Sequence, residues 1–516
     1  MNVLWVSQGK VESQAGQPYS DELNVRLRVL APANFLFDEG IHSDFVCPNE
    51  NWTKNDFEGL TSYDLIVFAS PSMAVEREMA LAAKETNVAI VVDLVSDPNG
   101  SSEANSIAQQ MLSIANTVTV PSLFYKNLLN DSLEVGADIV ADPVEQYRRR
   151  AVFNPNEKLN LLCLCDVVDR HFDKLFAELV ILAEDINVKL IVMAKNVEEV
   201  KKTTVRYEVN LNQPFQFDIQ EWNEVEIPHN IINSDVVMLP CSENSSNAFG
   251  RSRLLCESLW MGKFVVASES EVRKEFQQFA WISEDLTSGV KWAIENQNDV
   301  LGVIRAGQKY VESNNDWQSI TQQWKRVFQS ALAKKLLFNI NKSGNPVRLN
   351  LGCGDKLLDG YINVDVVDAR LEKKPDIQSD LQDLSFIASN SVDEILSVHV
   401  VEHFWRWEVE AVLSEWKRIL KPNGKMILEC PNLQSACETF LENPDLRAGE
   451  GGEGQRTMWV FYGDPAWKDE LMVHRWGYTP NSLGKMLEKI GFRQIRQEAA
   501  EFKLREPRDM RIVGIK

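Results

Sequence analysis

The sequence has no long apolar run. No stretch approaches the roughly 18 consecutive apolar residues that a membrane-spanning helix requires. Residues 1–5 also lack the basic start of a secretory signal peptide. Both absences argue against a membrane-spanning or secreted protein, so we expect a cytoplasmic protein with no membrane span.

Positive charge is also scarce. Lysine and arginine total 54 against 75 acidic residues, which gives a formal net charge of −21. Binding a nucleic acid backbone as the main task needs an excess of cations, so we expect no nucleic acid partner. The eight cysteines include no Cys-x-x-Cys pair. This disfavours the common zinc and redox motifs and favours reduced thiols.

What the sequence does contain is enough apolar material for several hydrophobic cores. At about 150 residues per domain, 516 residues suggest three domains. Short apolar runs alternate with helix-like segments, which is typical of parallel α/β folds. We therefore predict the class α/β, with three Rossmann-like, doubly wound parallel-sheet domains at residues 1–145, 146–338 and 345–516.

Three local features complete this prediction. The spacing of apolar residues predicts a long amphipathic helix over residues 314–337. The polar stretch 339–346 is the best linker candidate. The chain should finish with an edge strand of the third sheet, at residues 508–516.

A glycine turn opens the last third of the chain. The apolar run 347–351 breaks into Gly352-Cys353-Gly354, as when a buried parallel strand ends and leads into a helix. Glycine lets backbone N–H groups approach a ligand closely there. A second apolar segment ends at Asp365, where a carboxylate could hold the two hydroxyls of a ribose. This spacing is too short for the dinucleotide fingerprint, which needs a third glycine and a later acid.

Taken together with its neighbours, this region resembles the class I S-adenosylmethionine-dependent methyltransferases. The match is carried by an ordered set of segments: residues 351–354, 363–365, 391–395, 401–404 and 420–424. The resemblance implies S-adenosylmethionine as cofactor. Its contacts would be Gly352, Gly354, Asp365, Asp380 and Leu381.

The first two domains resemble two-Rossmann glycosyltransferases that use nucleotide sugars. The matching segments are residues 115–122, 141–144, 233–240 and 254–268. The resemblance implies that Glu257 grips the donor ribose, while Asn247, Arg251 and Arg253 face the diphosphate. A guanidinium suits that place because its rigid fork matches phosphate oxygens. Many retaining members carry a glutamate eight positions earlier, where this sequence has Phe249.

Three histidines are candidates for the base that methylation of a hydroxyl needs. His399 and His403 follow the fourth strand of the third domain, and His474 lies in a late aromatic-rich insertion. Histidine suits proton transfer near neutral pH. A hydrogen-bonded structural role is the alternative for each of them, and Glu402 could cap or support the turn.

The same residues spell His-x-x-Glu-His over 399–403, the inverted zinc-peptidase pattern. A zinc pair wants both histidines on a settled helix, with a third ligand further on. Here the pattern begins where a strand is expected to end. We therefore predict no metal site.

The sequence thus predicts a bifunctional enzyme, a glycosyltransferase joined to an S-adenosylmethionine-dependent methyltransferase, that acts on a cell-surface glycan in polysaccharide biosynthesis. Its partners would be a nucleotide-sugar donor and a glycan acceptor. The alternative is a methyltransferase whose N-terminal region is a non-catalytic glycan- or nucleotide-binding module.

Overall fold

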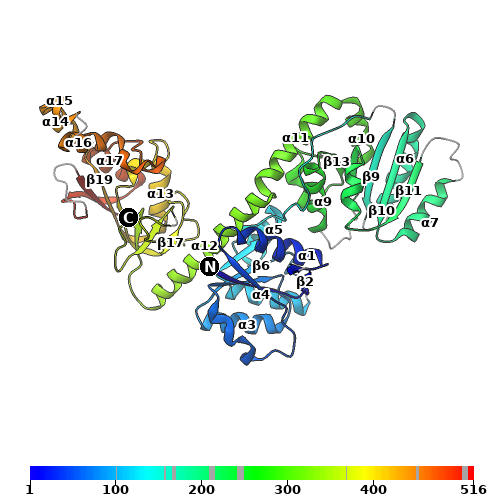
Figure 1. The fold of residues 1–516 in the computed structure, drawn as a ribbon, viewed down its shortest axis with the longest axis horizontal. Coiled ribbons are helices and arrows are strands. Elements are labelled where there is room, and N and C mark those ends of the chain that lie inside the picture. Colours follow the sequence, from blue (N-terminus) through cyan, green and yellow to red (C-terminus); the bar gives the residue numbers. More distant parts are fainter. Residues whose placement is uncertain are drawn as a thin grey trace. The chain divides into compact units, whose positions relative to one another are not determined.

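The computed structural model describes most of the chain, in two compact units. The described residues are 1–14, 16–99, 102–155, 158–165, 170–208, 216–240, 249–367, 369–448, 452–502 and 509–516. Contacts divide the chain into unit 1, Met1–Phe328, and unit 2, Gln329–Lys516. Unit 1 contains two large sheets and unit 2 contains one (Figure 1).

The first sheet of unit 1 is six-stranded and parallel. Its spatial order is β4 (His42–Val46), β1 (Asn2–Ser7), β5 (Leu65–Ala69), β6 (Ala89–Asp93), β7 (Thr117–Val120) and β8 (Asp138–Ile139). Strands β5 and β6 are buried along their whole length, in keeping with their apolar sequences LIVFA and AIVV, the latter followed by Asp93. The flanking helices include α2 (Ala31–Phe37), α3 (Ala74–Glu85), α4 (Glu103–Ile114) and α5 (Leu123–Leu133).

The second sheet of unit 1 is also six-stranded and parallel. Its order is β11 (Gln216–Glu221), β10 (Val188–Ala194), β9 (Leu159–Cys165), β12 (Val236–Leu239), β13 (Phe264–Ala267) and β14 (Trp281–Ile282). Its helices are α6 (Arg170–Asp185), α7 (Val197–Glu208), α8 (Ile227–Ile232), α9 (Phe249–Trp260), α10 (Leu286–Glu295) and α11 (Gln297–Asn314).

The sheet of unit 2 has seven strands. Their order is β17 (Ile377–Gln378), β16 (Ile362–Asp365), β15 (Arg348–Leu351), β18 (Val392–Val398), β19 (Leu420–Pro431), β21 (Asp509–Ile515) and β20 (Arg493–Glu498). The first five run parallel, and β21 pairs antiparallel with both of its neighbours. The helices are α13 (Val409–Ile419), α14 (Leu433–Glu442), α15 (Pro444–Arg447), α16 (Gly452–Tyr462) and α17 (Pro480–Ile490).

One predicted position in this sheet is wrong. The last strand, β21, lies inside the sheet, and β20 forms the edge. Strand β20 has the sequence RQIRQE and is mostly exposed or half-buried. A polar edge strand of this kind carries little apolar signal, so the sequence did not reveal the strand that covers β21.

Helix α12, Trp317–Lys342, is longer than the predicted helix and runs into the stretch predicted as a linker. Its Trp324 and Phe328 rings pack against Trp5, with centroids 5.0 and 6.1 Å away. Further along, Ala333 and Leu337 belong to the hydrophobic core of unit 2. The structure therefore divides inside this helix, while the three domain boundaries remain predictions.

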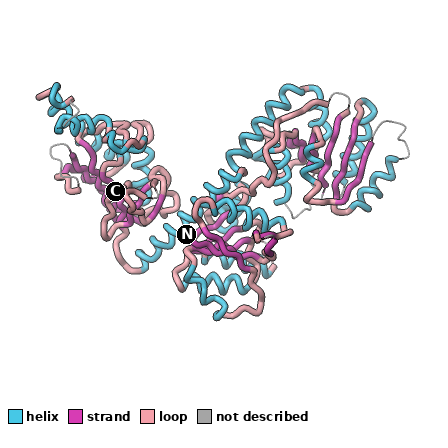
Figure 2. Tube along the Cα trace, viewed as in Figure 1, coloured by secondary structure: helices cyan, strands magenta, loops and turns pink. Residues whose placement is uncertain are grey.

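The predicted fold class is confirmed. Three mostly parallel sheets are flanked by helices, as the strands and helices of Figure 2 show. In such folds ligands bind at the carboxyl ends of the strands.

Candidate functional site

The glycine turn after β15 is held in a conformation that favours glycine. Gly352 has φ +74°, and a Cβ added there would lie 2.3 Å from Cγ2 of Val400. Gly354 has φ +53°. Residues with a side chain are strained at such angles, so the turn favours glycine at both positions. At Gly352 the close approach of Val400 also leaves no room for a Cβ. The backbone N–H of Gly354 donates to Oδ2 of Asp365, at 2.7 Å.

Asp365 ends β16 and ties the glycine turn to it. The residue is 8% exposed, and its Oδ1 accepts a hydrogen bond from the N–H of Val367 at 3.2 Å. A carboxylate has about four acceptor positions, so two backbone bonds leave capacity for ribose hydroxyls.

The other two predicted cofactor contacts lie in different surroundings. Asp380 is exposed, and its Oδ1 accepts the N–H of Gln382 at 2.9 Å. Leu381 lies in the hydrophobic core, and its carbonyl accepts the indole N–H of Trp416 at 2.8 Å. An adenine contact from this pair would therefore come from Asp380 or from the backbone.

The structure brings the three predicted histidines together around Glu402. His399 follows β18 with φ +56°, an unusual backbone angle for a residue with a side chain. Its Nδ1 lies 3.2 Å from Oε1 of Glu402, and its Nε2 lies 3.4 Å from Oδ1 of Asp509. Because both ring nitrogens face carboxylates, His399 is placed to hold Glu402 rather than to take a proton.

His403 and His474 are arranged differently from His399. Nδ1 of His403 lies 3.1 Å from the carbonyl of Val473, and Nδ1 of His474 lies 3.0 Å from the carbonyl of Val460. A carbonyl can only accept, so Nδ1 carries a proton in each ring, and the neutral ring then has its lone pair on Nε2. Nε2 of His474 is 3.9 Å from Oε1 of Glu402. The two rings meet edge to face, with centroids 5.0 Å apart.

Backbone hydrogen bonds connect the late insertion to this cluster. The N–H groups of Arg475 and Trp476 donate to the carbonyl of Glu402, at 2.8 and 3.2 Å. This contact carries His474 to a site more than 70 positions earlier in the sequence.

The charges in the cluster follow from burial and from neighbouring rings. Burial alone would raise the pKa of Glu402, but the hydrogen bond from His399 and the charges of the three histidines lower it to about 2. Burial lowers the pKa of His403, although Glu402 opposes this. At neutral pH the site therefore holds an anionic Glu402 and a neutral His403, with His399 as the closest partner of the carboxylate.

Two functional candidates were missed by the sequence analysis. Asp509 begins β21 and supports His399, but a lone aspartate far along the chain carries no local signal. Arg370 binds Asp469 at 3.2 Å and lies over the ring of Trp467, 5.1 Å from its centroid. A Cβ on Gly354 would meet Arg370 at 3.8 Å, so this arginine links the glycine turn to the late insertion.

In unit 1, Glu257 lies on α9 and is 2% exposed. Its Oε1 accepts the backbone N–H of Glu145 at 2.8 Å, whereas Oε2 has no hydrogen-bond donor among the described residues. Burial raises the pKa of Glu257 to about 7, against the opposing bond from Glu145.

Arg253, on the same helix, pairs with Glu224 at 2.7 Å. It also lines a cavity of about 370 Å³ whose walls include Ser122, Asp142 and Asn315. Asn247 lies outside the described residues, and so do the side chains of Phe249 and Arg251. Two of the predicted donor contacts, Arg253 and Glu257, thus share one helix.

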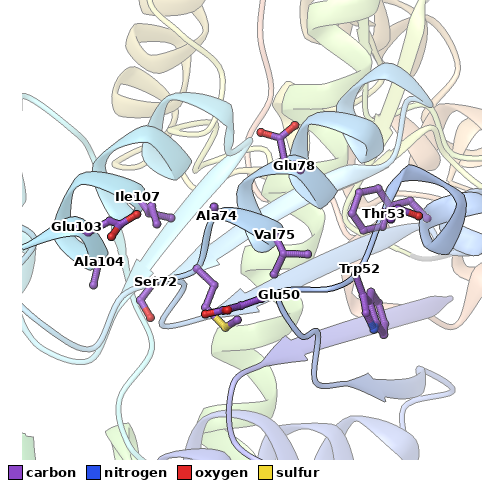
Figure 3. A pocket seen from close by; sticks show the side chains of 12 residues that line it. Glu50, Trp52, Thr53, Ser72, Ala74, Val75, Glu78, Glu103, Ala104 and Ile107 are labelled. Carbon is purple, nitrogen blue, oxygen red and sulfur yellow. The ribbon is translucent and has the colours of Figure 1, made fainter.

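A larger cavity lies elsewhere in unit 1 (Figure 3). It measures about 780 Å³ and is lined by segments before and within α3 and α4, with Glu50, Glu78 and Glu103 in its walls. None of the residues predicted to bind a ligand lines it. Three glutamates would repel a diphosphate, so this cavity does not suit a nucleotide-sugar donor.

In the parts of the chain that the structure describes, no helix is long and apolar enough to cross a membrane.

Comparison with known protein families agrees with the methyltransferase resemblance. Residues 350–428 match the family described as methyltransferase domain, so unit 2 contains a methyltransferase domain. No curated protein matches the chain.

Three similar solved structures are distant from this chain in sequence. The Anabaena HepE structure with UDP and glucose is 14% identical over 64% of this chain and 100% of its own, with a TM-score of 0.45. A Rickettsia africae glycosyltransferase is 13% identical over 64% and 98%, with a TM-score of 0.44. An Archaeoglobus fulgidus S-adenosylmethionine-dependent methyltransferase is 17% identical over 37% and 100%, with a TM-score of 0.23.

Proposed function

We propose that unit 2 transfers a methyl group from S-adenosylmethionine to a hydroxyl of a cell-surface glycan, and that unit 1 is a nucleotide-sugar glycosyltransferase on the same chain. Joining the two would raise the effective concentration of the shared glycan at the second site. The observation that carries the proposal is the bond between the N–H of Gly354 and Asp365, within a region that matches a methyltransferase family.

The turn supports a nucleoside ligand on two grounds. Gly352 and Gly354 keep side chains away from the carboxyl end of β15. Asp365 is fixed beside them by two backbone bonds and still has acceptor capacity for the ribose hydroxyls.

Methyl transfer is an in-line displacement, so the enzyme mainly positions the two reactants and excludes water. The acceptor oxygen attacks the methyl carbon while the bond from carbon to sulfur breaks, and that electron pair stays on sulfur. The hydroxyl proton passes to Nε2 of His403 or His474, each of which keeps a lone pair. His399 would orient Glu402 and take no proton itself.

Aromatic residues near the cluster suit a glycan acceptor. Trp405 and Trp407 stack with ring centroids 4.9 Å apart, and both rings are exposed. The guanidinium of Arg475 lies over Trp405 at 5.4 Å. Flat aromatic faces of this kind can stack against sugar rings.

For unit 1, Glu257 and Arg253 are the proposed donor contacts. The alternative is a binding module without catalysis. It is favoured by the pairing of Arg253 with Glu224, which occupies part of that guanidinium. Incubation with radiolabelled nucleotide sugars separates the two, since only a transferase releases the nucleoside diphosphate in proportion to glycan labelling.

Calorimetric titration with S-adenosylmethionine tests the methyltransferase proposal. We expect saturable binding to the parent protein and a loss of about tenfold or more in Asp365→Ala, since a charged hydrogen bond is worth about 1.5–3 kcal/mol. Asp359→Ala is the matched control, because Asp359 is an exposed aspartate near the same turn. A parent protein that gives no binding heat would refute the proposal.

A further inference from the structure

We propose that Glu402, His403 and His474 form a binding site for one divalent transition-metal cation. The site lies beside the proposed methyl-transfer centre and differs from the peptidase pattern in the sequence. That pattern would use His399 and His403 on a helix, whereas here His399 binds two carboxylates. His474 supplies the second imidazole instead.

The three side chains already lie close together. One ligand atom from each residue falls within 4.8 Å of the others. At bonds of about 2.0–2.2 Å, two ligands of a tetrahedral zinc ion lie roughly 3.4 Å apart. The side chains would therefore have to approach one another by up to about 1.4 Å to close the set around a cation.

The two imidazoles are oriented as metal ligands usually are. In most metal sites a ligating histidine donates its other ring N–H to a carbonyl or carboxylate, which fixes the tautomer. The carbonyls of Val473 and Val460 do this for His403 and His474. In the neutral form of both rings, the Nε2 lone pairs are thus available before any cation binds.

The carboxylate of Glu402 also has an oxygen atom available for a cation. Glu402 is buried, and Oε2 has no hydrogen-bond donor among the residues that the structure describes. Oε1 faces His399, which is held in turn by Asp509. A buried carboxylate oxygen without a donor is costly, and a cation would relieve that cost.

The ligand types define the class of metal. Two imidazole nitrogens and one carboxylate oxygen suit zinc, manganese, iron or cobalt in the divalent state, and do not suit calcium or magnesium. Three protein ligands leave an open coordination position, as in catalytic rather than structural zinc sites. A cavity of about 510 Å³, lined largely by residues 458–473, borders Val473 beside the cluster.

The role of the cation in activating the acceptor hydroxyl rests on the proposed function, whereas its binding does not. A hydroxyl bound at the open position would lose its proton more readily. Its O–H bond would break, the proton would pass to water, and the electron pair would remain on oxygen. The cation would thereby replace the two imidazoles as the means of activating the acceptor.

The test measures metal binding on the full chain, without substrate. The protein is stripped with a chelator and dialysed against cobalt(II). We expect one cobalt per chain by elemental analysis and visible absorption bands of a nitrogen- and oxygen-ligated ion. His403→Gln and His474→Gln should each weaken cobalt binding about tenfold or more. His229→Gln is the matched control, because His229 is an exposed histidine of unit 1.

A parent protein that binds no cobalt, or cluster variants that bind it as tightly as the control, would overturn the proposal. Circular dichroism confirms that each variant is folded. The S-adenosylmethionine titration on the same samples keeps the two proposals apart. Intact cofactor binding without cobalt refutes only the metal site, and cobalt binding without cofactor binding refutes only the methyltransferase function.

Discussion

Glu402 and Glu257 are equally buried carboxyl groups, each 2% exposed, yet they are in opposite states. The pKa of Glu402 is lowered to about 2, whereas that of Glu257 is raised to about 7. Burial pushes both pKa values upward. Three histidines lower the pKa of Glu402, whereas the backbone groups of Glu145 and Gln146 and the charge of Arg253 oppose burial at Glu257 only in part.

The difference teaches that burial alone does not decide whether a carboxyl group is charged. The hydrogen bond from His399 and the charges of the histidines outweigh the desolvation of Glu402, whereas desolvation prevails at Glu257 despite the charge of Arg253. The cluster around Glu402 in unit 2 is thus built around a fixed anion. The unit 1 helix instead carries an acid whose charge changes near physiological pH.

The largest expected effect is that of Glu402→Gln. Removing the anion breaks the pair between His399 and Glu402, and breaking a buried pair costs about 3–5 kcal/mol. Urea unfolding monitored by tryptophan fluorescence at pH 6 measures this loss. An unchanged midpoint would mean that His399 and Glu402 form no ion pair.

Gly352→Ala should disturb the cluster from the neighbouring turn. The added Cβ would collide with Val400, two residues before Glu402, at a positive φ. Overpacking costs about 1–3 kcal/mol. Hydrogen exchange by mass spectrometry should show faster exchange in unit 2 and unchanged exchange around Glu257. Equal changes in both units would contradict this separation.

The two carboxyl groups should give opposite pH dependences, each of about 1.4 kcal/mol per pH unit within its window. The pKa of Glu402 is lowered from 4.5, so its stabilisation is complete above pH 4.5 and is lost as the pH falls toward 2. The pKa of Glu257 is raised from 4.5, so stability declines as the pH rises from 4.5 to about 7. The difference in unfolding free energy between parent and each Glu→Gln variant, followed against pH, isolates each contribution.

Glu257→Gln should have the smallest effect, and of opposite sign. Glutamine can still accept the N–H of Glu145, and it cannot ionise. At pH 8 we expect the variant to be more stable than the parent by about 1 kcal/mol, because the gain from avoiding a buried charge is partly offset by the buried amide N–H₂ group of glutamine. A clear loss of stability at pH 8 would show instead that the ionised form is the one that the fold stabilises.

The sequence was sufficient to predict those parts of the fold whose signal lies in neighbouring residues. Buried parallel strands such as β5 and β6 are continuous apolar runs, and the turn at Gly352 follows one of them directly. The role of Asp365 could be anticipated in part, since it ends the next strand. Its hydrogen bond with the N–H of Gly354 could not be predicted, because the pattern of apolar residues carries no information about that contact.

The cluster could be predicted only as separate candidates. His403 and His474 lie 71 positions apart, and they meet because backbone N–H groups of Arg475 and Trp476 bind the carbonyl of Glu402. Asp509 reaches His399 from β21, which is separated from β18 by β19 in the sheet. Such meetings depend on strand order and on loop docking, neither of which leaves a periodic trace in the sequence.

Helix α12 has a practical consequence for anyone who wishes to separate the methyltransferase from the rest. The boundary suggested by sequence would remove Ala333 and Leu337, which fill the interior of unit 2. A shortened protein starting at residue 345 would therefore expose apolar surface and tend to aggregate. Proteases, which favour exposed loop tips, would find continuous helix where the two units join.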